Sequence, residues 1–296
     1  MPEVSEHKKG VFYAIICYLA WGFYPLYWKL LQHVPAVEIL CHRLFWSMVF
    51  MVLFFSVIKR CRIRQHVKTL RQWGTLLLTG LLMTANWGVY IWAINSGNII
   101  QSSLGHYINP LFSILFGCIF LHEKMNKIQW TALILATTGV VYLTAGYGEF
   151  PWISAVIALT FTLYAYFRKK AGIDATPALT VETLFMSVPA LAYLATTFVQ
   201  GNNTLCHFDL TTAVLLALSG AVTAVPMLWF GMATQRIQLS TLGFIQYLSP
   251  TFQLVIGTFV FNENFTKAHL VCFIFIWSGL LLYTISQMKS KKMSKE

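Results

Sequence analysis

Long apolar stretches separated by short polar breaks run along almost the whole chain of 296 residues. Each stretch has about 20 residues, the length an α-helix needs to cross a hydrocarbon core of about 30 Å at a rise of about 1.5 Å per residue. The pattern therefore predicts ten membrane-spanning helices, at residues 11–31, 37–58, 73–95, 99–121, 128–146, 150–168, 177–199, 211–235, 239–261 and 267–287. These spans and their loops leave no room for a soluble domain or a nucleotide-binding cassette.

Composition supports a chain surrounded by lipid. Apolar residues make up 57% of the sequence and charged residues only 10%, with 23 Phe, 13 Tyr and 10 Trp. A soluble domain of this size has too little interior to bury so much apolar surface. The expected fold class is an all-α integral membrane protein.

The basic residues predict the orientation of the spans. With the N-terminus inside, the inner loops and termini hold 18 of the 21 Lys and Arg, an outer loop holds Lys267, and Lys29 and Arg43 lie within spans. Such a bias follows the positive-inside rule, so both termini are expected on the cytoplasmic side. It also accounts for the net charge of +11. Because this charge lies in short loops beside an anionic leaflet, we expect lipid and not nucleic acid as the partner of the basic face.

Two segments of the chain match without a gap at a distance of 140 residues, namely 107–143 and 247–283. Eight positions are identical: Tyr107/Tyr247, Pro110/Pro250, Phe112/Phe252, Gly117/Gly257, Glu123/Glu263, Lys127/Lys267, Ile134/Ile274 and Gly139/Gly279. The match predicts two related five-helix units, residues 1–147 and 148–296. In membrane proteins such repeats typically enclose a central site.

The repeat is predicted to be inverted. Because the first unit contains five spans, an odd number, the second unit enters the membrane from the opposite face. Glu123 is then expected on the cytoplasmic side and Glu263 on the outer side. Two shorter matches agree: LYWK, which ends at Lys29, resembles AYFR, which ends at Arg168, and VEIL around Glu38 resembles VETL around Glu182.

Charged residues inside spans are costly, so they should face a partner or a cavity. Arg43 lies about 9 Å from the outer end of its span by the helical rise. It has two interpretations: a structural group that pairs with Glu38 or reaches the interface, or a fixed cation for an anionic solute. Lys29 and Glu38 flank a short turn, which favours an ion pair between them.

Three acidic or titratable side chains are candidates for proton coupling: Glu38, His42 and Glu182. His42 follows Glu38 by four residues and so shares its helix face. Glu182 has two open interpretations, coupling to solute or protons and pairing with the basic cluster at Arg168. His106 precedes Tyr107 and the Asn109-Pro110 step deep in its span, which makes it a further candidate for the cavity.

Matched prolines predict where the helices bend. Pro110 and Pro250 occupy equivalent places in the fourth and ninth spans, and each removes one backbone hydrogen bond. The freed carbonyls could bind a ligand or absorb a rocking motion, and the alternative is a kink that only shapes packing. We therefore treat both prolines as hinge candidates.

Aromatic and amide residues inside the spans are expected to line a solute cavity. Such walls suit an amphipathic organic solute better than a small inorganic ion. The candidates, with the charged residues above, are Trp21, Tyr24, Arg43, Asn86, Trp92, His106, Tyr107, Asn109, Tyr164, Glu182, Trp229, Gln246, Tyr247 and Ser249. The eight histidines form no metal-binding pattern, so neither a metal nor a cofactor is expected.

Several of these features resemble one known family. They are Trp21-Gly22 in the first span, Arg43 in the second, the Pro-to-Glu segments of spans four and nine, LGHYINPL (104–111), STLGFIQYLSPT (240–251) and WAIN (92–95). Together they resemble the EamA branch of the drug/metabolite transporter superfamily, and within it the RarD-type permeases. A Leu-Gly-Glu common in that family is Leu121-His122-Glu123 in this chain.

The resemblance implies a permease of the bacterial inner membrane and favours export. We expect a secondary transporter, as a monomer or homodimer, that moves a small organic metabolite or drug-like solute by alternating access, with protons as one energy source. Without a nucleotide-binding motif, ATP coupling is not expected. The alternatives are an intramembrane enzyme, for which no reactive constellation is present, and a receptor, which would not require an inverted repeat.

Overall fold

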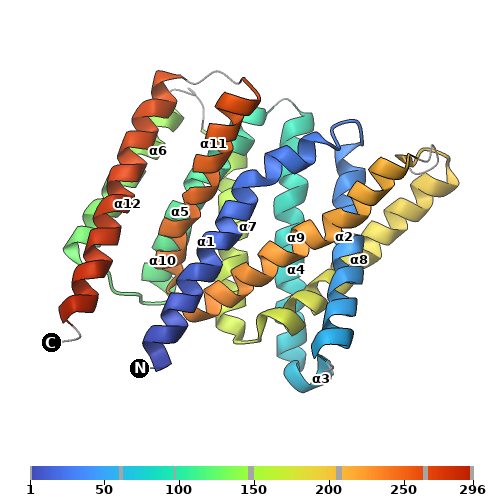
Figure 1. Cartoon of the computed structure of the whole chain (residues 1–296), viewed down its shortest axis with the longest axis horizontal. Coiled ribbons are helices and arrows are strands. Elements are labelled where there is room, and N and C mark those ends of the chain that lie inside the picture. The colour runs from blue at the N-terminus through green and yellow to red at the C-terminus, as the bar shows by residue number, and fades with distance from the viewer. Residues whose placement is uncertain are drawn as a thin grey trace.

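The computed structural model describes residues 2–59, 63–96, 98–145, 150–204, 209–262 and 266–293, and it contains helices but no strand in these ranges. The helix α1 (Pro2–Lys29) begins and α12 (Lys267–Met293) ends at the same edge of the molecule (Figure 1). Between them lie α2 (Ala36–Leu53) with the π-helix η1 (Phe54–Lys59), α3 (Ile63–His66), α4 (Leu70–Asn95), α5 (Ile99–Phe120), α6 (Lys127–Ala145), α7 (Trp152–Ala171), α8 (Ala175–Val199), α9 (Leu210–Arg236), α10 (Leu239–Gln246) and α11 (Leu248–Val260).

Eight helices in the described ranges are long and apolar enough to cross a membrane: α1, α2, α4, α5, α6, α8, α9 and α12. Two of the ten predicted stretches are not among them. One forms α7, which ends in Arg168, Lys169 and Lys170, and the other forms the short helices α10 and α11. The chain is a multi-pass membrane protein, and the full count of ten crossings stays a prediction.

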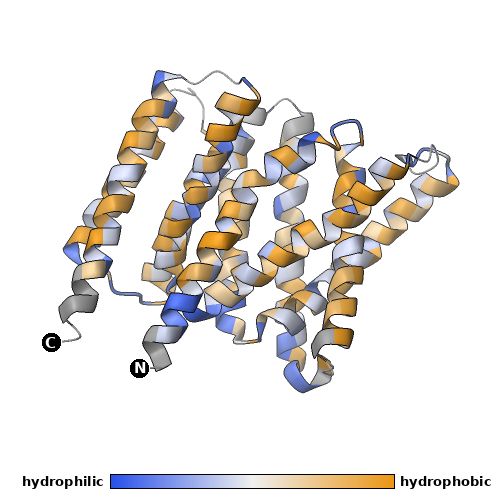
Figure 2. Cartoon of the chain, viewed as in Figure 1, coloured by the Kyte–Doolittle hydropathy of each residue, from blue (hydrophilic) through white to orange (hydrophobic). Residues whose placement is uncertain are grey.

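The outer faces of the helices are apolar. Figure 2 shows hydrophobic residues along most of the helix surfaces and hydrophilic residues concentrated toward the helix ends and loops. Large apolar side chains such as Leu53, Ile134 and Val188 are more than half exposed. In a bilayer these side chains contact lipid, while the helical backbone satisfies its own hydrogen bonds.

Helix packing relates the first and second parts of the chain. The helix α1 packs along α9 and α11, while α7 packs along α4 and α5. The helix α2 packs on α9 and α8, and α8 also packs on α4. The helices α6 and α12 form a pair, as do α5 and α10. Each of these contacts has a counterpart when α1, α2, α4, α5 and α6 are exchanged for α7, α8, α9, α10–α11 and α12.

Two matched helix ends adopt a left-handed backbone. His122 follows α5 with φ of 54°, and Asn262 follows α11 with φ of 56°. Glycine adopts this conformation most easily, which explains why the family that the chain resembles often has Gly at the position of His122. The turn brings Glu123 back against Gly117, where an added Cβ would lie 2.5 Å from the carboxylate Oε2. Glu263, the predicted counterpart of Glu123, lies outside the described residues.

The two hinge candidates differ in local structure. The helix α5 continues through Pro110, whereas the predicted ninth span is interrupted at Tyr247, three residues before Pro250. Because proline has no N–H, the carbonyls of His106 and Gln246 lose their usual helical donors. The two matched prolines therefore differ: the helix is continuous through Pro110 and is interrupted three residues before Pro250.

Candidate functional site

A cavity of about 270 Å³ lies between α1, α2, α4, α5, α7, α10 and α11. Its walls combine aromatic rings, amides and one guanidinium. They are formed by Tyr18, Trp21, Tyr24, Pro25, Trp28, Arg43, Met83, Asn86, Trp87, Tyr90, His106, Asn109, Ile157, Phe161, Gln246, Ser249, Pro250 and Gln253. A volume of this order fits a small organic molecule, although it lies slightly below the roughly 300–1,000 Å³ of most ligand pockets.

The cavity lies toward the end of the bundle opposite to the two chain termini. It draws on the last part of α1 and the first parts of α2, α5 and α7, as expected for helices that alternate in direction (Figure 1). At the other end, the Glu123 carboxylate accepts hydrogen bonds from the backbone N–H groups of Leu239 and Ser240 at 2.7 and 2.8 Å. The Ser240 hydroxyl also donates to Glu123 at 2.7 Å. These contacts tie the end of α5 to the start of α10.

Arg43 is the charged group of the cavity wall. Its guanidinium lies between two indole rings, 4.5 Å from the centroid of Trp28 and 4.4 Å from that of Trp87. Its Nε donates to the Thr223 hydroxyl at 3.1 Å. None of the ion pairs formed by the described residues includes Arg43. The two rings confine the guanidinium without neutralising it, so its charge remains available to an anion.

Hydrogen bonds orient the amides of the cavity. The Asn86 amide donates to the Ile157 carbonyl at 2.7 Å, which links α4 to α7. The Asn109 Oδ1 accepts from the Thr162 hydroxyl at 3.2 Å, and the Gln253 amide donates to the Trp21 carbonyl at 3.1 Å. Each amide is thereby held by a neighbouring helix, so the polar lining is preorganised.

Two cavity positions are matched between the repeated segments. His106 aligns with Gln246, and Asn109 aligns with Ser249, at the same spacing of 140 residues. All four of these residues line the cavity. Of the two matched prolines, Pro250 lines it and Pro110 does not. The equivalent parts of the two segments therefore meet at one site.

Nine of the candidates from the sequence line this cavity: Trp21, Tyr24, Arg43, Asn86, His106, Asn109, Gln246, Ser249 and Pro250. Others lie elsewhere. Tyr107 and Tyr247 pack in an apolar cluster with α6 and α12, because one step along a helix turns a side chain by about 100° from its neighbour. Trp92 is 48% exposed, and its ring contacts Trp152 at a centroid distance of 5.8 Å. Trp229 packs against the main apolar core.

The ion pair expected between Lys29 and Glu38 is not formed. Glu38 instead accepts hydrogen bonds from the backbone N–H and the hydroxyl of Thr204, both at 2.9 Å. Its Oε1 lies 3.8 Å from His42 Nε2, on the helix face that the spacing predicted. The ammonium of Lys29 lies 4.1 Å from the centroid of the Phe261 ring. Thr204 and Phe261 lie far away in the sequence, so the spacing of Lys29 and Glu38 could not reveal these partners.

Glu182 pairs with Arg168, one of the two interpretations of the sequence. Arg168 Nε lies 3.5 Å from Glu182 Oε1, and both residues are almost fully buried. The Thr79 hydroxyl donates to the same oxygen at 2.6 Å, and the Tyr164 hydroxyl approaches Oε2 at 3.4 Å. Glu182 and Tyr164 do not line the large cavity.

Several wall residues were missed in the sequence. Trp28 belongs to the LYWK motif, which was interpreted only as part of the repeat. Tyr90 and Phe161 lie among many other aromatic residues of the sequence. Gln253 gave a usable signal, since an intramembrane amide four residues after Ser249 shares its helix face. The remaining aromatic residues carry no mark that separates packing from lining.

The apolar bundle and its internal, partly polar cavity define a multi-pass membrane protein with a solute-sized site. A model of the EamA-like transporter family matches residues 8–145. The chain is 40% identical to the uncharacterized transporter YojE of Bacillus subtilis (strain 168), over 98% of each chain. It is 36% identical to Protein RarD of Streptomyces exfoliatus, over 100% of this chain and 94% of that one. It is 35% identical to Protein RarD of Escherichia coli (strain K12), over 98% of each.

One solved crystal structure has the same fold, with a TM-score of 0.75 at 12% identity over 94% of this chain and 98% of that chain. The chain belongs to the EamA-like transporter family, as its motifs indicated, and it is a membrane transporter. Its relatives carry the names of transporters or of RarD.

Proposed function

We propose that this transporter carries a small organic anion across the bacterial inner membrane, and that the large cavity is its solute site. The observation that carries the proposal is Arg43, an intramembrane guanidinium held between Trp28 and Trp87 at the cavity wall. A charge inside a membrane protein is retained where it has a partner or a ligand. Since no described carboxylate pairs with Arg43, an anionic solute is the partner we assign to it.

The other walls define the rest of the solute. The indole and phenol rings of Trp21, Tyr24 and Tyr90 offer flat apolar faces, and the amides of Asn86 and Gln246 lie among them. An amphipathic molecule with one anionic group and an apolar body fits this lining better than an inorganic ion. The whole site is built from one chain, so the proposed transporter works as a monomer, alone or within a homodimer.

Transport is proposed to occur by alternating access between two inverted halves, residues 1–147 and 148–296. The gapless match of 107–143 with 247–283 and the exchange of helix contacts between the two parts support this proposal. Hydrogen bonds from Leu239 and Ser240 to Glu123 tie α5 to α10 at the end that carries the termini, which the positive-inside rule assigns to the cytoplasm. We propose that the cavity lies nearer the outer face of the membrane. The proposed direction, export, rests on the family resemblance alone.

The interrupted helix at Pro250 and the proline at Pro110 are the proposed hinges. Replacing either proline by alanine restores a backbone donor and stiffens the helix. We expect Pro250→Ala to lower the transport rate more than Pro110→Ala, with both proteins produced at normal levels. Unchanged flux in both variants, measured in proteoliposomes, would remove the hinges from the mechanism.

The candidates for proton coupling lie in different places relative to the large cavity. Glu38, His42 and Glu182 all lie outside the large cavity, whereas His106 lines it. Arg43 from α2, Tyr90 from α4, and Tyr18 and Tyr24 from α1 are the other ionisable groups that line the same cavity. We therefore propose that the coupling proton binds at His106, next to the anion.

The test of the function uses three solutes that share one body and differ in charge: 3-phenylpropanoate, 3-phenylpropanol and 3-phenylpropylamine. The full chain is reconstituted in proteoliposomes, and the flux of each labelled solute is compared with that of empty liposomes. We expect protein-dependent flux of the carboxylate and none of the amine. Flux of the amine alone would overturn the assignment of an anion, and absence of flux for a broad panel of solutes would favour a receptor.

A further inference from the structure

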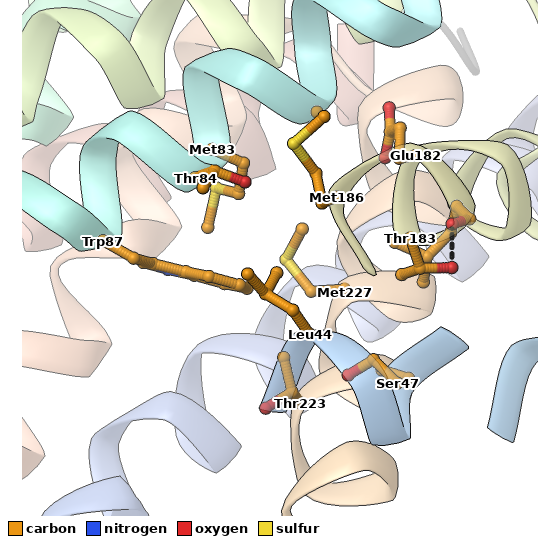
Figure 3. Close-up of a pocket in the computed structure, with 13 residues that line it drawn as sticks. Leu44, Ser47, Met83, Thr84, Trp87, Glu182, Thr183, Met186, Thr223 and Met227 are labelled. Atoms are coloured by element: carbon orange, nitrogen blue, oxygen red, sulfur yellow. Dashed lines mark hydrogen bonds between the residues drawn. The ribbon is translucent and has the colours of Figure 1, made fainter. Parts of the chain in front are cut away.

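A second, smaller pocket adjoins the cavity, and it is lined by methionines from three helices. Figure 3 shows Met83 of α4, Met186 of α8 and Met227 of α9 converging, with Trp87 alongside them. The pocket has a volume of about 30 Å³, room for roughly one methyl group or one water molecule. Met83 and Trp87 line both this pocket and the large cavity.

The small pocket lies next to the proposed anion site. The Trp87 ring centroid lies 4.4 Å from the Arg43 guanidinium carbon, and the Trp87 side chain lines both spaces. Thr223, which accepts the hydrogen bond from Arg43 Nε, also lines the small pocket. A solute whose anionic group binds Arg43 therefore has this pocket as its immediate neighbour.

The lining favours an apolar occupant over water. The Ser47 hydroxyl donates to the Gly220 carbonyl at 3.1 Å, and the Thr183 hydroxyl donates to the Leu179 carbonyl at 2.9 Å. Glu182 is held by Thr79 and Arg168. Among the described lining residues, the Thr84 hydroxyl alone is buried without a hydrogen-bond partner. Much of the remaining lining is apolar, with Leu44, Leu179 and Ala224 beside the three methionines, so an apolar occupant fits it better than a water molecule, which needs two to four polar partners.

Methionine gives this pocket an adjustable size. The unbranched thioether side chain has several low-energy rotamers and adapts to ligands of different shape. Met186 and Met227 lie on α8 and α9, outside the walls of the large cavity, so they can move without disturbing it.

We propose that the methionine pocket, defined by Met83, Met186 and Met227, is the subsite for the apolar end of the transported anion. This inference rests on the proposed function, because it takes Arg43 as the site of the anionic group. The pocket then sets the length of solute that the transporter prefers. Its ligand is an aliphatic segment of a monocarboxylate, of which the terminal methyl group enters the pocket.

Two substitutions change the pocket in opposite directions. An added Cβ at Gly80 would lie 3.3 Å from the Cε and Cγ atoms of Met186, so Gly80→Ala makes the pocket smaller. Met186→Ala makes it larger. Gly74→Ala is the matched control on the same helix, since a Cβ at Gly74 has no atom within 4 Å.

The probes are the straight-chain alkanoates from butanoate to octanoate, titrated calorimetrically against each purified full-length protein. Each methylene that enters the pocket should raise the affinity of the original protein about fourfold, up to an optimum length. We expect Gly80→Ala to shorten that optimum by about one carbon and Met186→Ala to lengthen it. Gly74→Ala should leave it unchanged.

An optimum length that is the same in all four proteins would overturn the subsite while leaving the anion site in place. Failure of the original protein to bind any alkanoate would instead overturn the proposed function, and the subsite with it. Should Gly80→Ala not fold, the outcome for Met186→Ala decides, because that variant must favour longer chains.

Discussion

Two arginines lie inside the helix bundle, and their surroundings differ. Arg168 is almost fully buried, lies 3.5 Å from the Glu182 carboxylate and has no contact with the large cavity. Arg43 lies between two indole rings, has no described carboxylate as a partner and lines the cavity. The charge of Arg168 is neutralised by Glu182, whereas the charge of Arg43 is held in place and remains available to a ligand.

The difference separates a structural charge from a binding charge. The attraction within a buried ion pair must offset the cost of removing both charges from water. Removing one partner leaves an uncompensated buried charge. A guanidinium that faces a cavity between aromatic rings keeps its charge for a ligand. Loss of the Arg168 pair should therefore damage folding, and loss of Arg43 should damage solute binding.

The largest effect is expected from breaking the Arg168 pair. Glu182→Leu leaves the Arg168 guanidinium buried without its carboxylate and should lower the free energy of unfolding by about 3–5 kcal/mol. Denaturant titration in detergent micelles measures it. The double variant Arg168→Met with Glu182→Leu should recover most of the loss, because both buried charges are then gone. A fully stable Glu182→Leu protein would contradict the structural role of the pair.

Removing the Arg43 charge should affect binding far more than folding. Arg43→Gln deletes a charged hydrogen-bonding partner of about 1.5–3 kcal/mol, which corresponds to a loss of about 10- to 100-fold in carboxylate affinity. Calorimetric titration with 3-phenylpropanoate measures this loss. Lys29→Gln is the control, since Lys29 lies over the Phe261 ring outside the cavity. An equal loss of affinity in both variants would show that Arg43 is not the group that binds the carboxylate.

A smaller effect is expected from the ring that orients Arg43. Trp28→Leu removes one of the two aromatic faces of the guanidinium, an interaction of about 0.5–2 kcal/mol. The carboxylate affinity should fall roughly 2- to 30-fold, and Trp28→Phe should retain part of it. An affinity that follows side-chain volume and not aromaticity would mean that Trp28 only fills space.

The smallest effect concerns pH. A protonated His106 adds a positive charge to the Arg43 cavity, so carboxylate affinity should fall a few-fold as rising pH removes this proton. His106→Gln, which copies the matched residue Gln246, should flatten this dependence. Glu182→Gln should keep it, since Glu182 belongs to the closed pair. A pH dependence lost in Glu182→Gln and kept in His106→Gln would reverse the roles assigned to the two clusters.

Much of the fold was predictable because a membrane imposes a strong pattern on sequence. Helix positions follow from apolar stretches of fixed length, and polar residues inside those stretches, such as His106, Gln246 and Ser249, were correct candidates for the cavity wall. The failures concern partners distant in sequence. The spacing of Lys29 and Glu38 indicated an ion pair, but Thr204 and Phe261 provide their contacts. The interruption at Tyr247 was not distinguishable from the continuous helix at Pro110, since both segments carry the same proline.

The most direct test of Arg43 as the solute's anion site is exchange of labelled 3-phenylpropanoate across proteoliposomes that contain the original protein, Arg43→Gln or Lys29→Gln. Equal reconstitution is verified for each protein. We predict rapid exchange with the original protein and with Lys29→Gln, and exchange reduced at least about 10-fold with Arg43→Gln. Exchange by Arg43→Gln at the rate of the original protein would contradict the account.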